Sequence, residues 1–82
     1  MKVIIIDDEP QSHLALGAQL EKNYPFIQIL GNAYNVAEGH TLILKHAPDL
    51  IFLDIEMPDG TGFDLLQKFA ELTFQIIFVT AH

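Results

Sequence analysis

Four short runs of apolar, largely β-branched residues recur along the chain and constrain its fold more than any other feature. They are Val3–Ile6, Ile27–Leu30, Leu50–Leu53 and Ile76–Val79. The first, third and fourth runs are continuous rather than alternating, which is typical of strands buried on both faces of a parallel sheet. Stretches with helical signals separate the runs, so the predicted element order is β-α-β-α-β-α-β.

The first predicted helix begins at Glu9–Pro10, because Pro is tolerated in the first turn of a helix. Asp8 is its expected N-cap. The helix carries Leu16 and Leu20 four residues apart and ends near Asn23.

The two later helices carry capping signals. Asn35 and Glu38 form the pattern of a capping box, and Ala47–Pro48 ends that helix. Thr61 and Asp64 are a similar pair for a third helix, whose inward residues are expected to be Phe63, Leu66 and Phe69. Helices that join parallel strands cross in a right-handed sense and cover both faces of the sheet. The sequence therefore predicts an α/β fold.

The composition limits the classes of protein to which this chain can belong. Its 82 residues, half of them hydrophobic, allow one small domain with a core, residues 1–82. The absence of Cys excludes disulfides and thiolate metal sites. No apolar run approaches the ~20 residues of a membrane span, and the N-terminus does not have the pattern of a secretory signal. Four Lys and no Arg against eleven acids argue against binding to a nucleic-acid backbone. We expect a cytoplasmic, acidic protein.

Acidic residues follow two of the predicted strands. Asp7, Asp8 and Glu9 come directly after the first strand, and Asp54 comes directly after the third. In an open α/β sheet, ligands bind at the carboxyl ends of the strands, where the winding reverses. Carboxylates brought together there repel one another unless a cation is bound, and ligands that are all oxygen favour Mg²⁺ over Zn²⁺. The alternative is that Asp7, Asp8 and Glu9 form only a solvated turn, since the dipole of a following helix favours acids.

Asp54 lies at the mouth of a buried strand, where a bare carboxylate is costly unless it is used or paired. It is a candidate nucleophile, because carboxylates form acyl-phosphate intermediates. Thr80 ends the fourth run at the same edge of the sheet, and its hydroxyl is a candidate donor to a phosphoryl oxygen. The alternative for Thr80 is an ordinary β-branched strand residue.

The segments that carry these residues closely resemble the receiver domain of two-component response regulators. The segments are Ile6–Pro10, Pro48–Gly62 and Ile77–Ala81, and the resemblance extends over the whole chain. It implies a doubly wound, flavodoxin-like parallel sheet with the strand order 2-1-3-4.

The resemblance also implies a role for individual residues. Asp54 matches the phospho-acceptor, and Asp7 and Asp8 match the acidic pair that holds Mg²⁺. The backbone carbonyl of Glu56 matches the main-chain metal ligand, and Thr80 matches the hydroxyl residue that turns toward the phosphoryl group. The implied phosphoryl donor is a sensor histidine kinase. The implied role is that of a switch for an output domain, rather than of a turnover enzyme. The beginning and end of the chain resemble receivers attached to LytTR-type DNA-binding domains, which suggests transcriptional regulation by a segment outside this sequence.

Receivers contain further elements beyond the point where this sequence stops. The resemblance leads us to expect a fourth helix, a fifth strand and a fifth helix after His82, so the chain is interpreted as a C-terminally truncated receiver. The fifth strand brings a Lys that pairs with the acceptor, so we expect impaired phosphorylation of this chain alone, with Mg²⁺ binding retained. Ile76–Val79 becomes an open sheet edge, which predicts self-association through that edge.

Two other interpretations of the acidic motif remain open. A phosphatase of the haloacid-dehalogenase type also uses an Asp nucleophile after a strand, and Asp54, Glu56 and Asp59 imitate its motif. In those enzymes, however, the nucleophile usually follows the first strand. A pseudo-receiver would bind a partner without being phosphorylated.

The histidine and aromatic residues do not suggest a further site. No pair of the four His has metal-ligand spacing with a third partner, and His13 and His40 are predicted to lie on helix surfaces. Tyr24, Phe26 and Tyr34 are expected to be packing or boundary residues, because no basic residues interleave with them.

Overall fold

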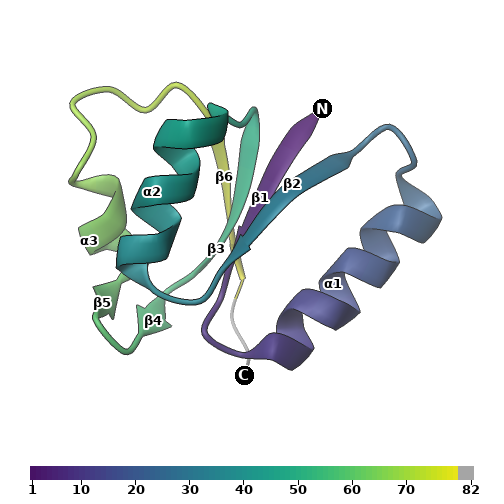
Figure 1. The fold of residues 1–82 in the computed structure, drawn as a ribbon, viewed down its shortest axis with the longest axis horizontal. Coiled ribbons are helices and arrows are strands. Elements are labelled where there is room, and N and C mark those ends of the chain that lie inside the picture. Colours follow the sequence, from purple (N-terminus) through teal and green to yellow (C-terminus); the bar gives the residue numbers. More distant parts are fainter. Residues whose placement is uncertain (80–82) are drawn as a thin grey trace.

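A four-stranded parallel sheet runs through the centre of the molecule (Figure 1). The structure is a computed structural model that describes residues 1–79. The strands are β1 (Lys2–Ile6), β2 (Gln28–Ala33), β3 (Leu50–Asp54) and β6 (Gln75–Val79), in the order β2-β1-β3-β6. Because β6 is the fourth predicted run, the predicted order 2-1-3-4 is confirmed.

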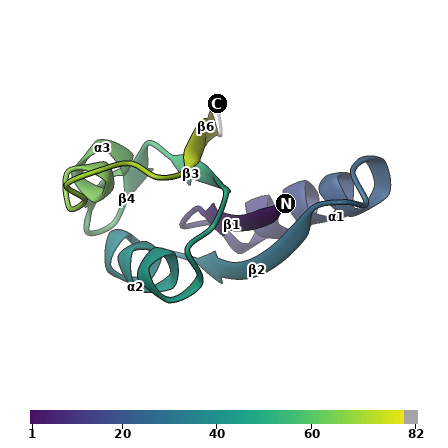
Figure 2. The ribbon, with the colours of Figure 1, turned by 90° about the horizontal axis from the view of Figure 1, so that it is seen from above.

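Helices cover both faces of the sheet, as the doubly wound fold requires (Figure 2). Helix α1 (Pro10–Asn23) lies on one face, and α2 (Val36–His46) and α3 (Gly62–Leu66) lie on the other. None of the helices within residues 1–79 has the length and hydrophobicity needed to cross a membrane.

Strands β1 and β3 are buried on both sides because alternate residues enter two separate cores. Ile4 and Ile6 of β1 pack into the core under α2 and α3, whereas Val3 and Ile5 pack into the core under α1. Leu20 of α1 belongs to the second core, and Leu16 packs against it. This two-sided burial explains why the sequences of β1 and β3 are continuous apolar runs. The prediction that the fourth run is also buried on both faces is wrong, because Ile77 and Phe78 of β6 are exposed and this strand pairs with a neighbour on one side only within residues 1–79.

The helix caps differ from the prediction at one of three positions. Asn35 accepts a hydrogen bond from the Glu38 amide at 2.8 Å, and Thr61 and Asp64 form a complete capping box at α3. The prediction that Asp8 caps α1 is wrong, because the N-cap is Glu9 and its side chain makes no capping bond. Pro10 opens the helix and removes one of the N–H groups that a cap would satisfy.

A small hairpin follows β3 and was not expected from the sequence. It pairs β4 (Glu56–Met57) with β5 (Gly60–Thr61) in antiparallel fashion. Gly60 has a φ of 150°, a conformation that residues with side chains rarely adopt. A turn in this loop agrees with its content of Gly and Pro. The two strands have only two residues each, so they are too short to show the alternation of polar and apolar residues that predicts a strand.

The inward face of α3 is centred on Leu65, which is fully buried, and Leu66 and Phe69 pack against the same core. The prediction that Phe63 points inward is wrong, because it is 52% exposed. Leu65 follows Gly62 by three residues and therefore shares its face, whereas Phe63 is turned by about 100° from Gly62. Phe63 contacts Phe78 of β6 instead, with ring centroids 5.2 Å apart.

Candidate functional site

Three carboxylates from two neighbouring strands converge at the carboxyl edge of the sheet. Asp7 and Asp8 follow β1, Asp54 ends β3, and β1 and β3 are paired in parallel. One carboxylate oxygen from each residue lies within 4.8 Å of the others. Asp7 and Asp54 are buried, and Asp8 is exposed to solvent. The structure thus brings together the acids that the sequence analysis placed at one edge.

The surroundings of Asp54 disfavour its charged form. Burial raises the pKa of the Asp54 carboxyl, and the negative charge of Asp7 raises it further. The Asp8 carboxylate also raises this pKa, because it can accept a hydrogen bond from the protonated form of Asp54. The backbone amides of Glu56 and Ile55 oppose these effects and lower the pKa, but the net direction is upward. A cation placed among the three oxygens would relieve this repulsion, because an opposite charge favours the ionised carboxylate.

Asp7 is held by hydrogen bonds at three of its polar groups. Its amide donates to the Ala33 carbonyl at 3.0 Å, and its Oδ1 accepts from the Glu9 amide at 2.9 Å. Its backbone carbonyl oxygen lies 2.8 Å from Nε2 of His13. The position of Asp7 is therefore fixed by β2, by the turn into α1 and by a side chain of α1 itself.

His13 is buried, so the prediction that it lies on the helix surface is wrong. It is three residues before Leu16 and seven before Leu20, a spacing that places all three on one helix face. Leu20 is in the core, and Leu16 packs against it. This spacing is the sequence signal that could have identified His13 as an inward residue.

Gly62 permits a close approach between the start of α3 and the end of β3. A Cβ atom at this position would lie 2.6 Å from the backbone oxygen of Asp54. The Gly62 amide also donates to the Ile55 carbonyl at 2.8 Å, which closes the loop after the acidic residue. Gly62 could not be identified from the sequence, because close backbone contact leaves no sign in a single sequence.

Asp59 ties the β4–β5 turn to the beginning of α2. Its carboxylate accepts hydrogen bonds from the amides of Val36 at 2.7 Å and Ala37 at 3.0 Å. These bonds favour the ionised form, and the Val36 bond makes the largest contribution to the lowered pKa of Asp59. Asp59 therefore acts as a second cap on α2, supplied from a distant part of the sequence.

Two of the predicted site residues are not tested by this geometry. Glu56 lies in β4, directly after the acidic edge, but the role of its carbonyl as a metal ligand stays a prediction. Thr80 lies outside the described residues.

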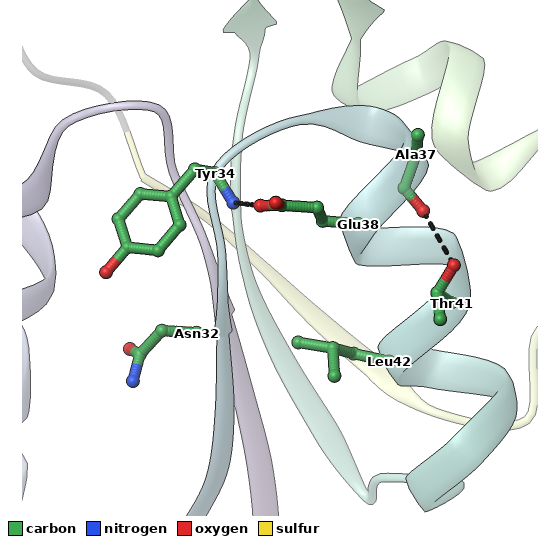
Figure 3. Close-up of a pocket in the computed structure, with 6 residues that line it drawn as sticks. All are labelled: Asn32, Tyr34, Ala37, Glu38, Thr41 and Leu42. Atoms are coloured by element: carbon green, nitrogen blue, oxygen red, sulfur yellow. Dashed lines mark hydrogen bonds between the residues drawn. The ribbon is translucent and has the colours of Figure 1, made fainter.

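A shallow pocket lies between β2 and α2 (Figure 3), and none of the three carboxylates lines it. Several of its polar groups already have partners within the chain. The Tyr34 amide donates to the Glu38 carboxylate at 2.9 Å, and the Thr41 hydroxyl donates to the Ala37 carbonyl at 3.1 Å. We therefore do not assign a site to the lining residues Asn32, Tyr34, Ala37, Glu38, Thr41 and Leu42.

Comparisons with known proteins agree on one family. A profile of the response regulator receiver domain matches residues 3–82. The sensory transduction protein LytT of Enterococcus faecalis is 37% identical over 84 residues, which cover 100% of this chain and 34% of that protein. A protein-glutamate methylesterase/protein-glutamine glutaminase of Methanospirillum hungatei is 38% identical over 73 residues, covering 89% of this chain and 21% of that protein.

A solved structure supports the same fold. The MaeR response regulator bound to beryllium trifluoride superposes with a TM-score of 0.90 at 25% identity. The match covers 100% of this chain and 68% of that chain. This chain thus spans about a third of the LytT relative and about two thirds of the MaeR chain.

Proposed function

The chain belongs to the response regulator receiver family, the signalling switches of two-component systems, and from this premise we propose that Asp54 accepts a phosphoryl group from a sensor histidine kinase. The observation that carries the proposal is the convergence of Asp7, Asp8 and Asp54, with oxygens within 4.8 Å of one another. A carboxylate at the end of a buried strand, next to two further acids, has the chemistry of a phosphoryl acceptor.

The same three residues fit a Mg²⁺ ion. All of their ligand atoms are carboxylate oxygens, which Mg²⁺ prefers. Burial and the charge of Asp7 raise the pKa of Asp54, and a bound cation would favour its ionised form. We propose that Asp7, Asp8, Asp54 and the backbone carbonyl of Glu56 hold the metal. When bound, Mg²⁺ supplies positive charge that offsets the charge on the phosphoryl oxygens.

The transfer is balanced by the two residues that exchange the group. An oxygen of Asp54 forms the new O–P bond while the N–P bond of the partner's phosphohistidine breaks. The imidazole keeps the electron pair of that bond and takes up a proton. Thr80 is the proposed hydrogen-bond donor to the phosphoryl group after transfer, and its movement would report the added charge to the surface.

The relatives are longer than this chain, and each contains residues beyond the matched receiver segment. Their length supports the proposal that this chain is part of a longer signalling protein. We propose that residues 1–82 form part of one receiver domain that switches an output domain, with transcriptional regulation as the output. The LytT relative supports the longer protein, because the match covers 100% of this chain and 34% of that sensory transduction protein. A cytoplasmic location follows from the proposed exchange with a histidine kinase.

Amide NMR spectroscopy with Mg²⁺ and beryllofluoride tests the site. Mg²⁺ alone should shift the amide signals of Asp7, Asp8 and Asp54 in this chain. Beryllofluoride should add a shift near Asp54 when the chain is extended by the segment that carries the expected fifth-strand Lys. The variant Asp54→Asn should lose the beryllofluoride response. Mg²⁺ titration without a shift at these three residues would contradict the proposal, and turnover of p-nitrophenyl phosphate would favour a phosphatase instead.

We also propose that β6 associates with a second copy of the chain through its outer edge. Within residues 1–79, β6 pairs with β3 on one side only. Its Ile77 and Phe78 are substantially exposed, at 47% and 41%. An apolar edge strand with unpaired N–H and C=O groups is a template for another strand.

Sedimentation velocity tests this association. The chain should associate at concentrations of tens of micromolar, and Ile77→Lys should make it a monomer because a charged edge resists strand pairing. Leu14→Lys is the matched control, since Leu14 is an exposed apolar residue of α1, and it should leave association unchanged. A wild-type monomer at tens of micromolar would contradict the proposal.

A further inference from the structure

A buried imidazole connects the acidic edge to strand β2. Nε2 of His13 lies 2.8 Å from the Asp7 backbone oxygen, and Nδ1 lies 2.7 Å from Oδ1 of Asn32. The Asp7 carbonyl can only accept a hydrogen bond, so Nε2 is the donor in that pair. Nδ1 of the neutral ring then accepts a hydrogen bond from the Asn32 side chain when its amide is turned by 180°, which exchanges the positions of its nitrogen and oxygen. Both ring nitrogens therefore have partners, which fixes the plane of the ring.

Tyr34 covers the outer side of this imidazole. The centroids of the His13 and Tyr34 rings are 4.4 Å apart, and the rings are tilted by 42°. Figure 3 shows the Tyr34 ring and the Asn32 side chain on one side of β2, opposite the α2 side chains of Glu38, Thr41 and Leu42. The imidazole is thus only 6% exposed, although it is polar and lies in the first turns of a surface helix.

The hydrogen bond from His13 acts on both acids of β1 through the peptide group that joins them. The carbonyl oxygen of Asp7 and the Cα atom of Asp8 belong to the same planar unit. A donor that fixes this oxygen therefore restricts the direction in which the Asp8 side chain leaves the backbone. Asp7 makes two other hydrogen bonds, one donated by its amide and one accepted by its Oδ1. These bonds act on different atoms and do not fix the Asp7 carbonyl oxygen.

We propose that His13 is a positioning residue for the metal site, which holds the Asp7–Asp8 peptide in the orientation that directs both carboxylates toward Asp54. Asn32 orients the imidazole, and Tyr34 shields it from water. This role rests on the proposed Mg²⁺ site. His13 does not touch the metal; it acts through the backbone of a metal-binding residue, as hydrogen-bonded partners of metal ligands commonly do.

The dissociation constant for Mg²⁺, measured on the 82-residue chain from amide shifts at one fixed pH, tests this role. His13→Leu keeps an apolar side chain but removes the donor, and it should weaken Mg²⁺ binding about tenfold. His13→Gln should recover most of the affinity, because its terminal amide can donate from the position of Nε2. Leu20→Ala is the matched control, since it removes core packing from α1 without touching Asp7. It should lower thermal stability and leave the Mg²⁺ affinity unchanged.

The outcomes separate this inference from the proposed function. A wild-type chain that does not bind Mg²⁺ would overturn both the metal site and the positioning role. A wild-type chain that binds Mg²⁺, with equal affinity in His13→Leu, would overturn the positioning role alone, as would an equal loss of affinity in Leu20→Ala. Should His13→Leu fail to fold, Asn32→Ala decides the question, because Asn32 is exposed on an edge strand. Reduced affinity in Asn32→Ala supports the inference, and unchanged affinity overturns it.

Discussion

Replacing Asp54 by Asn should stabilise the metal-free chain, because it removes one of three crowded negative charges. The relevant oxygens lie within 4.8 Å of one another, and at that distance two unit charges repel by about 3.5 kcal/mol at an effective dielectric constant of about 20. Solvent at the exposed Asp8 and the spread of charge over two oxygens reduce this value. We expect a net gain of about 1–2 kcal/mol, which corresponds to a rise in melting temperature of roughly 4–16 °C for a chain of this size.

Thermal unfolding followed by circular dichroism, in EDTA and in saturating Mg²⁺, measures this effect. In EDTA, Asp54→Asn should melt above the wild type. In Mg²⁺ the difference in melting temperature should narrow, because bound metal stabilises the wild-type chain more than it stabilises Asp54→Asn. Glu71→Gln is the matched control, since it removes one negative charge at an exposed position outside the cluster. It should leave the melting temperature nearly unchanged.

The dependence on pH follows from the direction of the Asp54 shift. Its pKa in the folded state lies above the usual value of an aspartate carboxyl, so protonation of Asp54 favours the fold. As the pH falls through the raised pKa, the wild type loses its repulsion and the advantage of Asp54→Asn should shrink. A variant that melts at or below the wild type in EDTA at neutral pH would refute this reasoning.

Three further substitutions test the loop and helix contacts. Gly62→Ala should lower the free energy of unfolding by about 1–3 kcal/mol in urea titrations, because its Cβ would lie 2.6 Å from the backbone oxygen of Asp54. Gly17→Ala should instead raise it by up to about 1 kcal/mol, since a Cβ in that helix meets only a side-chain atom at 3.8 Å. Asp59→Asn should destabilise the chain above the lowered pKa of Asp59, where the carboxylate caps α2. This loss of stability should disappear as the pH falls through that pKa, because the Asp59 carboxylate of the wild type becomes protonated and no longer stabilises α2 as an anion. Unfolding measured over a series of pH values tests this.

The sheet could be predicted from the sequence because its central strands are buried on both faces. The run Leu50–Leu53 has no polar residue to interrupt it, and the Asp that follows it marks the carboxyl end of the strand. The same pattern of apolar runs placed Asp7 and Asp54 at the carboxyl ends of two buried strands. The order of these strands, however, required the resemblance to receivers, because apolar runs alone do not specify which strands are neighbours.

The contacts that shape the site were less predictable, because they depend on tertiary packing. His13 was predicted to lie on the helix surface because it is polar, although its spacing from Leu16 and Leu20 indicates the buried face of the helix. Phe63 is apolar and yet exposed, because the capping box at Thr61 fixes the start of α3 and turns Leu65 inward instead. Close backbone approaches, such as the one at Gly62, have no period or pattern in a single sequence.

The central claim is that Asp54 is a Mg²⁺-dependent phosphoryl acceptor, and the most direct test is the site of covalent labelling. A chimera would join this chain, after His82, to the corresponding following segment of the Enterococcus faecalis LytT relative, so that the expected fifth-strand Lys is supplied. After incubation with phosphoramidate and trapping by borohydride reduction, peptide mass spectrometry locates the label. We predict Mg²⁺-dependent labelling at Asp54 that is absent from Asp54→Asn. The absence of a label, or a label on another residue that persists in Asp54→Asn, would contradict the claim.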